Sequence, residues 1–217
     1  MIAALKFALA IGRLFKSTST DAALILANIF PLHLKVVETV LKRSISGLAV
    51  LLPLSSSQIA GVSLGKILSS ATPAGTPLGL HRKRVVRSEM PSLWNSAWQN
   101  ANTGALTRLF FPTVESALVL STSKFPFFLC SFISGHCGLN YFLFKIKRSP
   151  SPLCSCQSGE VEDAAHILFV CASHVVHRAD LITSANEIKL SWPVSLDAFS
   201  QSKTLWSALI KFLSAIK

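Results

Sequence analysis

Four residues in the last third of the chain could together bind a metal ion: Cys154, Cys156, His166 and Cys171. Thiolate sulfur and imidazole nitrogen are preferred ligands of Zn²⁺, and four of them in a tetrahedron make a closed, structural site. The chain has five cysteines, and an odd number argues against a closed set of internal disulfides. Three of them lie close together with a histidine, which favours a metal site in a reducing compartment. The pattern therefore predicts a structural Zn²⁺ site, although Cys-x-Cys is less diagnostic than Cys-x-x-Cys, and His174 or His177 could replace one ligand.

The segments around these residues must supply two halves of the site. Two cysteines one residue apart can share a metal only on an irregular turn, which the neighbouring prolines and Gly159 favour. Residues 160–163 carry acids that suit the first turn of a helix bearing His166. Cys171 comes five residues after His166, which corresponds to about 140° around an ideal α-helix. We therefore expect the helix to end or loosen before Cys171.

Two other interpretations of the cluster stay open. The thiols could be free in an apolar domain, or one Cys/His pair could be the nucleophile and base of a thiol enzyme. An enzyme predicts one low-pKa, easily alkylated cysteine, whereas a zinc site predicts cysteines that are protected until a chelator is added. The remaining group, Cys130, His136 and Cys137, lies in an aromatic stretch and is expected in the core.

The charge balance indicates a polyanionic partner. Among 217 residues there are 21 Lys and Arg against 10 Asp and Glu, a net charge of +11. Such a surplus favours nucleic acid or anionic lipid, and the shortage of carboxylates argues against phosphoryl chemistry that depends on Mg²⁺. The densest basic clusters supply the predicted phosphate contacts: Arg82, Lys83, Arg84, Arg87, Lys145, Lys147 and Arg148.

The high mean hydropathy of +0.50 requires a test for membrane segments. Residues 125–144 are uncharged and match the roughly 20 residues that span a bilayer. Pro126, Gly135 and several polar residues interrupt them, which favours a buried core and leaves a membrane-associated protein as an alternative. The N-terminus has no long apolar run with a cleavage site, so we expect an intracellular protein of the nucleus or cytoplasm, not a secreted one.

Composition divides the chain into four segments, which together predict a mostly α fold of short helices, a small zinc-closed module and a poorly ordered linker. Residues 1–43 read as short helices, and residues 91–180 as a Trp-rich, zinc-binding domain. Residues 44–90 are rich in Ser, Gly, Thr and Pro and predict a low-complexity basic linker. Residues 181–217 predict a tail ending in an amphipathic helix with an apolar stripe formed by Leu205, Leu209, Phe212 and Ile216.

An ordered set of short motifs resembles a known family. The motifs are Trp94-x₃-Trp98, Thr103-Gly104, Phe110-Phe111-Pro112, Ser134-Gly135-His136 and then the Cys/His cluster. In this order they resemble the C-terminal region of the reverse transcriptases of non-LTR retrotransposons, where such segments precede a Cys-Cys-His-Cys zinc module. Residues 8–37 look like the segment that follows the polymerase core of the same proteins.

This resemblance implies a nucleic-acid-binding part of a polyprotein, with RNA or DNA as its partner. The sequence departs from the family in lacking the Asp-Asp pair of a polymerase hairpin, and residues 44–88 lack the carboxylates of a ribonuclease H domain. Cys137 also stands where the family usually has glycine. We therefore predict a truncated, non-catalytic fragment of a retrotransposon reverse transcriptase polyprotein that binds Zn²⁺ and nucleic acid.

Overall fold

The computed structural model of the protein describes residues 2–12, 14–45, 71–120 and 125–216. Helices dominate these ranges, and a single isolated antiparallel bridge, Leu153–Val161, is the β-pairing found within them. The mostly α prediction is confirmed. The α-helices are α1 (Ile2–Ile11), α2 (Thr20–Leu26), α3 (Leu32–Ile45), α6 (Leu78–Gln99), α7 (Ala105–Phe110), α8 (Val114–Leu120), α9 (Phe127–Ser134), α10 (Asn140–Lys145), α11 (Val175–Glu187), α12 (Leu196–Gln201) and α13 (Lys203–Ala215).

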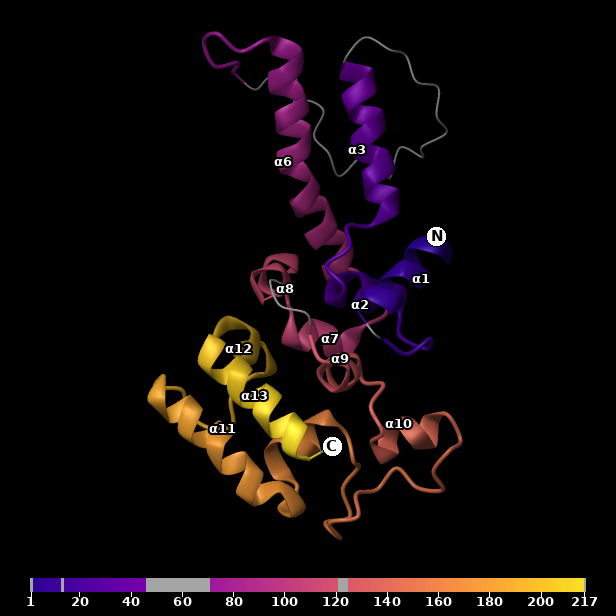
Figure 1. Ribbon diagram of the computed structural model, residues 1–217, viewed down its shortest axis with the longest axis vertical. Coiled ribbons are helices and arrows are strands. Elements are labelled where there is room, and N and C mark those ends of the chain that lie inside the picture. Colours follow the sequence, from indigo (N-terminus) through magenta and orange to yellow (C-terminus); the bar gives the residue numbers. More distant parts are fainter. Residues whose placement is uncertain (1, 13, 46–70, 121–124, 217) are drawn as a thin grey trace.

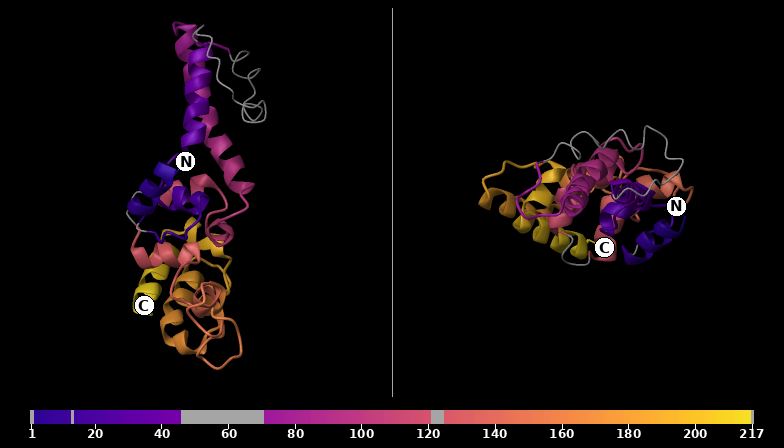
Figure 2. Two further views of the ribbon diagram at one scale, coloured as in Figure 1. Left: turned by 90° about the vertical axis from the view of Figure 1, so that its right-hand side faces the viewer. Right: turned by 90° about the horizontal axis from the view of Figure 1, so that it is seen from above.

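The molecule is elongated (Figure 1). Helices α3 and α6 stand side by side as a hairpin at one end, and α10 and α11 lie towards the other end, with α7, α8 and α9 between them. The side view shows the same arrangement, with the hairpin projecting from the body (Figure 2). The predicted short helices of residues 1–43 are present as α1, α2 and α3. Ser19 caps α2, because its Oγ accepts a hydrogen bond from the Ala22 N–H at 3.4 Å.

Helix α6 corrects one expectation. We predicted an irregular linker over 44–90, but the chain is helical from Leu78 onward, so the basic cluster lies on a helix. The physical reason is an apolar residue every fourth position, which forms a stripe along α6: Val86, Met90, Trp94 and Trp98, all buried. Residues 46–70 of the predicted linker lie outside the described residues.

The hairpin has its own small core. Val37 and Leu41 of α3 pack with Val86 and Met90 of α6. On α3, the buried Glu38 carboxylate accepts from Lys35 at 2.6 Å and also from Lys42. Apolar packing therefore holds the two helices together and leaves most of their cations at the surface.

The main core joins segments that are far apart in the sequence. It contains Ile25 and Leu26 of α2, Trp94 and Trp98 of α6, the pair Phe110 and Phe111, and Leu205, Trp206 and Leu209 of α13. The indole Nε1–H of Trp98 donates to the Phe111 carbonyl at 2.7 Å, and the Phe111 ring lies 5.6 Å from that of Trp206. The two tryptophans of the Trp-x₃-Trp motif therefore pack inside the protein. The division of the chain into four segments stays a prediction.

The aromatic stretch 125–144 is folded as two short helices. Helix α9 ends at Gly135, whose φ of 75° is a left-handed conformation, and α10 begins at Asn140. Across the ranges that the structure describes, no helix is long and apolar enough to cross a membrane. Cys130 is buried and Cys137 is half-buried, as expected for core positions.

Helix α13 carries the predicted amphipathic stripe. Leu205, Leu209 and Phe212 are all buried. They face the body of the protein, where α13 packs against α9, α11 and α12. Ile216 follows the helix and is partly buried against the same core.

Candidate metal centre

A tight turn carries the first two cysteines. The Leu153–Val161 bridge closes it, and the Cys154 N–H donates to the Glu160 carbonyl at 2.9 Å. Gln157 and Gly159 have φ values of 63° and 75°, which reverse the chain sharply. This is the irregular turn that the Cys-x-Cys spacing requires, and it brings Cys154 and Cys156 to one side.

A widened helical turn carries the other two residues. His166–Val170 form a π-helix, η1, and the Cys171 N–H donates to the His166 carbonyl, five residues back, at 2.8 Å. Asp163 caps this segment by accepting from the His166 N–H at 2.8 Å. Cys171 itself is extended, with φ −51° and ψ 120°. The expected loosening of the helix is therefore confirmed, and it returns Cys171 to the neighbourhood of His166.

The four potential ligand atoms converge. One atom each from Cys154, Cys156, His166 and Cys171 lies within 4.8 Å of all the others. The sulfurs of Cys154 and Cys171 are 3.7 Å apart, and the Cys156 sulfur is 3.3 Å from Nε2 of His166. Tetrahedral bonds of ordinary zinc length give about 3.8 Å between two sulfurs and about 3.6 Å between sulfur and nitrogen. The cluster therefore has the ligands and the dimensions to hold a metal ion.

The pKa values in the cluster differ between its members. The Ser158 hydroxyl, 3.2 Å from the Cys156 sulfur, and the Ser158 backbone lower the pKa of Cys156 to about 6. Burial and the neighbouring sulfurs raise the pKa of Cys154 to about 12. Burial alone would lower the pKa of His166, but Glu160 and Cys156 more than offset it and raise that pKa. Several thiolates this close repel one another, and a bound cation would relieve the repulsion.

Glu160 and Arg178 support the cluster. Oε2 of Glu160 lies 2.8 Å from Nδ1 of His166, which directs the other ring nitrogen to the cysteines. Such a carboxylate–histidine pair is usual behind a metal-bound imidazole. The buried Arg178 donates to the carbonyls of Ile167, Leu168 and Cys171 at 3.0, 2.6 and 2.7 Å.

Sequence reasoning missed both supporting roles. Glu160 was expected only as a first-turn acid, and its contact with His166 depends on how the turn folds back. Arg178 carried no signal in the sequence, because its three acceptors are backbone carbonyls of the π-helix η1 and of Cys171, which follows it. His174 and His177, considered as substitute ligands, stand apart from the four-residue cluster and face each other at 6.4 Å between ring centroids.

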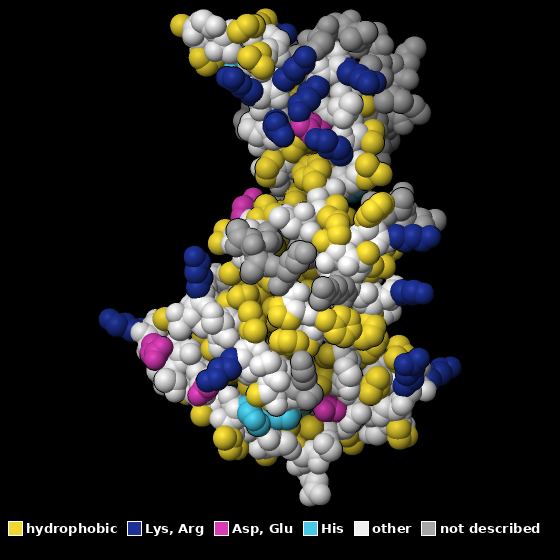
Figure 3. Space-filling model, in the orientation of Figure 1, with side chains coloured by type: hydrophobic (Ala, Val, Ile, Leu, Met, Phe, Trp, Pro, Cys, Tyr) yellow, Lys and Arg dark blue, Asp and Glu magenta, His cyan; other side chains and the backbone are white. Residues whose placement is uncertain are grey.

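The predicted phosphate-contacting residues fall into two separate groups. Arg82, Lys83, Arg84 and Arg87 lie on α6, and Figure 3 shows Lys and Arg side chains gathered over the α3–α6 hairpin. Lys145, Lys147 and Arg148 are exposed at the end of α10, far along the molecule from the hairpin (Figure 1). The structure therefore does not bring the two groups together into one surface.

Two known proteins are similar to this chain. It is 28% identical over 176 residues to the Retrovirus-related Pol polyprotein from type-1 retrotransposable element R1 4 of Nasonia vitripennis, which covers 81% of this chain and 41% of that protein. It is 29% identical over 93 residues to the Retrovirus-related Pol polyprotein from type-1 retrotransposable element R1 of Bradysia coprophila, which covers 43% of this chain and 9% of that protein. The chain thus spans less than half the length of either relative. No protein-family model and no solved structure matches it. The relatives and the Cys/His cluster confirm the resemblance that the motifs indicated: the chain is related to the Pol polyproteins of non-LTR retrotransposons.

Proposed function

We propose that this chain is a zinc-stabilised, nucleic-acid-binding part of a retrotransposon Pol polyprotein, which supports reverse transcription by holding nucleic acid. The observation that carries the proposal is the convergence of three thiols and one imidazole within 4.8 Å, in a chain related to Pol polyproteins. Cys154, Cys156, His166 and Cys171 would hold the ion. Four protein ligands leave no open position for water, so the ion would be structural.

The same cluster must be weighed as the active site of a thiol enzyme. Cys156, His166 and Glu160 alone would resemble a nucleophile, a base and the group that orients the base. The sulfurs of Cys154 and Cys171 converge on the same point, however, and a nucleophile has no use for two further thiols there. The complete set of four favours metal binding.

Metal analysis tests the zinc assignment. Purified, reduced protein should contain one Zn²⁺ per chain, and Cys154→Ser and Cys171→Ser should each lose it. Cys137→Ala is a matched control, since Cys137 is half-buried but outside the cluster. Absence of stoichiometric zinc from the reduced protein, or full retention by Cys154→Ser, would overturn the assignment.

The α3–α6 hairpin is the proposed surface for phosphates. The two helices carry seven Lys and Arg against two Glu, and one of those glutamates is the buried Glu38. Cations bound to phosphates release counterions, so affinity should fall steeply with salt. The exposed Lys83, Arg84 and Arg87 are the residues to remove.

A salt titration of nucleic-acid affinity tests this surface. The triple variant Lys83→Ala/Arg84→Ala/Arg87→Ala should bind more weakly, and its slope of log affinity against log salt should fall by about 2–3, at about 0.7–0.9 per phosphate contact. The charge-matched control removes three exposed lysines elsewhere: Lys6, Lys189 and Lys203. Undetectable or salt-insensitive binding by the unmodified protein, or equal losses in both triple variants, would contradict the proposal.

A further inference from the structure

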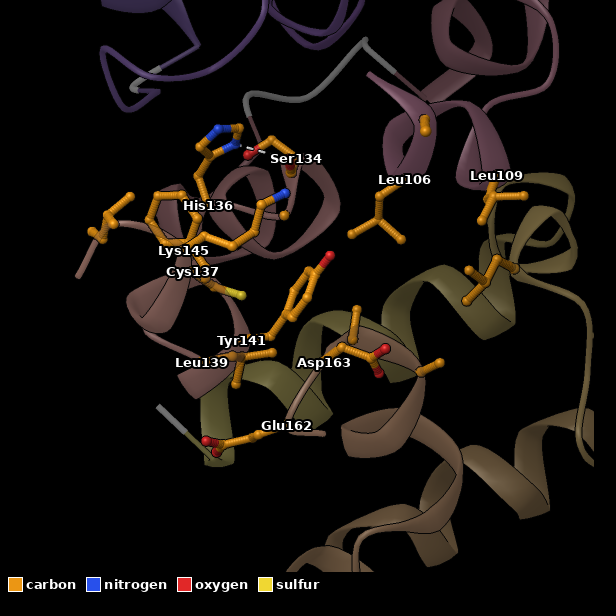
Figure 4. Close-up of a pocket in the computed structure, with 17 residues that line it drawn as sticks. Leu106, Leu109, Ser134, His136, Cys137, Leu139, Tyr141, Lys145, Glu162 and Asp163 are labelled. Atoms are coloured by element: carbon orange, nitrogen blue, oxygen red, sulfur yellow. Dashed lines mark hydrogen bonds between the residues drawn. The ribbon is translucent and has the colours of Figure 1, made fainter. Parts of the chain in front are cut away.

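A pocket of about 620 Å³ lies beside the metal centre and takes no part in it. It is formed by α7, α10, the turn after α9 and the residues that lead into η1 (Figure 4). Leu106 and Leu109 line one wall and Leu139 another, so most of its surface is apolar. The volume is large enough for a flat heteroaromatic group and its attached sugar.

Tyr141 stands in the middle of this pocket (Figure 4). The residue is 45% exposed, although it is anchored through the backbone, where the Tyr141 N–H donates to the Glu162 carbonyl at 3.2 Å. The neighbouring Asn140 N–H donates to the Glu162 carboxylate at 3.0 Å. The start of α10 is therefore fixed to the segment before η1, and the aromatic face is offered to a ligand at low cost in conformational entropy.

Lys145 completes this platform. Its ammonium lies 5.3 Å from the centroid of the Tyr141 ring, a cation–π contact. Within the described part of the chain this ammonium has no carboxylate partner. Lys147 and Arg148 follow at once and are exposed, and residues 140–159 contain no acid. A positively charged edge therefore borders an aromatic surface.

A hydrogen-bonding imidazole and a carboxylate lie on either side of Tyr141 in this pocket. Figure 4 shows the His136 imidazole on one side and the Asp163 carboxylate on the other side of Tyr141. The His136 ring is fixed, because its Nδ1 lies 2.8 Å from the Ser134 carbonyl oxygen. Flat apolar faces with a few hydrogen-bonding edges are the chemical character of a nucleobase, and a cationic rim suits the phosphates on either side of it.

We propose that this pocket binds an unstacked nucleobase of single-stranded nucleic acid, with the base stacked on Tyr141 and its flanking phosphates on Lys145, Lys147 and Arg148. The inference rests on the proposed function and adds the substrate class to it. A base inside a duplex is paired and stacked, and cannot enter a concave site without leaving the helix. The pocket should therefore select single strands, whereas the α3–α6 hairpin contacts phosphates of any strand.

The chain offers a direct probe of this site, because Tyr141 is its only tyrosine. Incorporation of 3-fluorotyrosine into the zinc-loaded 217-residue chain places one ¹⁹F resonance in the pocket. A single-stranded DNA and an RNA of the same sequence should shift that resonance, and their relative affinities will show which sugar is preferred. A blunt duplex of equal length should bind without shifting it.

Substitutions separate stacking from charge. Tyr141→Ala should weaken single-strand binding about tenfold or more, since one stacked base contributes about 1–3 kcal/mol. Tyr141→Phe should bind normally, and neither change should alter the salt slope. Phe144→Ala is the matched control, because Phe144 is a 46% exposed aromatic residue on the same helix that does not line the pocket.

The outcomes distinguish this inference from the function on which it rests. If nucleic acid binds with the expected salt dependence but Tyr141→Ala has no effect, or if duplex and single strand shift the resonance alike, the pocket assignment is wrong and the proposed function stands. A resonance that shifts with an aromatic peptide and not with oligonucleotides would identify a protein-docking pocket and also overturn it. If no nucleic acid binds at all, both proposals fail.

Discussion

The carboxylate of Glu160 lies 2.8 Å from Nδ1 of His166, while Nε2 of the same ring lies 3.3 Å from the Cys156 sulfur. Glu160→Gln removes the negative charge beside the imidazole and should lower Zn²⁺ affinity by about 10-fold. This is the low end of the roughly 10–100-fold range for such partners, because the Glu160 side chain is 54% exposed. Competition with a chromophoric chelator measures this change. Glu187→Gln, an exposed acid on α11, is the control and should leave the affinity unchanged.

The five cysteines should differ in their reaction with iodoacetamide. In the zinc-loaded protein no thiol should be alkylated quickly near neutral pH. A chelator should make Cys156 the first cysteine of the cluster to react, because without the ion its pKa is about 6, whereas that of the buried Cys154 is about 12. Cys130 and Cys137 should stay slow in the folded protein, because burial raises their pKa values to about 12 and about 11. Mass spectrometry counts the modified thiols. One rapidly alkylated cysteine in untreated, zinc-loaded protein would instead support a thiol enzyme.

Cys130 should also make the fold sensitive to alkali. Its pKa is raised from 9.0 to about 12 in the folded protein, so the unfolded chain loses this proton first. The contribution of the buried thiol is therefore complete below pH 9 and is lost as the pH rises towards 12. Urea unfolding between pH 8 and 10.5 should show stability falling above pH 9. Cys130→Ala should reduce that fall, and an equal slope in both proteins would contradict the assignment.

Arg178 should stabilise the segment that carries His166 and Cys171. Its guanidinium donates to the carbonyls of Ile167 and Leu168 in η1 and of Cys171 after it, and Arg178→Met would leave them without these donors. We expect a loss of about 2–4 kcal/mol in the free energy of unfolding. The zinc affinity should also fall, because the two ligands on this segment are no longer held in place. Lys203→Met, which removes an exposed cation, is the control for both measurements.

Alanine should destabilise the protein at one glycine, Gly104, but not at another, Gly79. Gly104 has a φ of 72°, and a Cβ there would lie 3.3 Å from the Trp98 ring and from Ala22. Gly104→Ala should cost about 1–3 kcal/mol of stability, through backbone strain and crowding. Gly79 lies in helix α6 with open space around it, so Gly79→Ala should be neutral or stabilising by up to about 1 kcal/mol. Thermal unfolding of the two variants checks this contrast, and a Gly104→Ala protein as stable as the unmodified protein would refute it.

Local spacing made the metal cluster predictable. A five-residue step from His166 to Cys171 does not suit an α-helix, so the sequence alone required a looser turn, and the π-helix supplies one. The apolar stripe of α13 was equally clear, because its apolar residues recur every three or four positions, the spacing of one helix face.

Features that depend on long-range packing could not be predicted from local spacing. The first half of α6 forms against α3, a helix about 40 residues earlier in the chain, and Pro91 together with four cations obscured its four-residue apolar spacing. The role of Arg178 depends on carbonyls whose positions only the folded backbone defines. The two basic groups looked equivalent in the sequence, and their separation follows from the elongated shape.

The main core has a consequence for biosynthesis. Ile25 and Leu26 of α2 belong to the same cluster as Leu205, Trp206 and Leu209 of α13, so that core is complete only when both helices are in place. During translation, α13 must emerge from the ribosome before Trp206 can cover Phe111. Contacts of such high sequence separation slow folding, because the chain between them must first lose its freedom. Until then the nascent protein would expose a large aromatic surface, and chaperones that shield such surfaces would act during that interval.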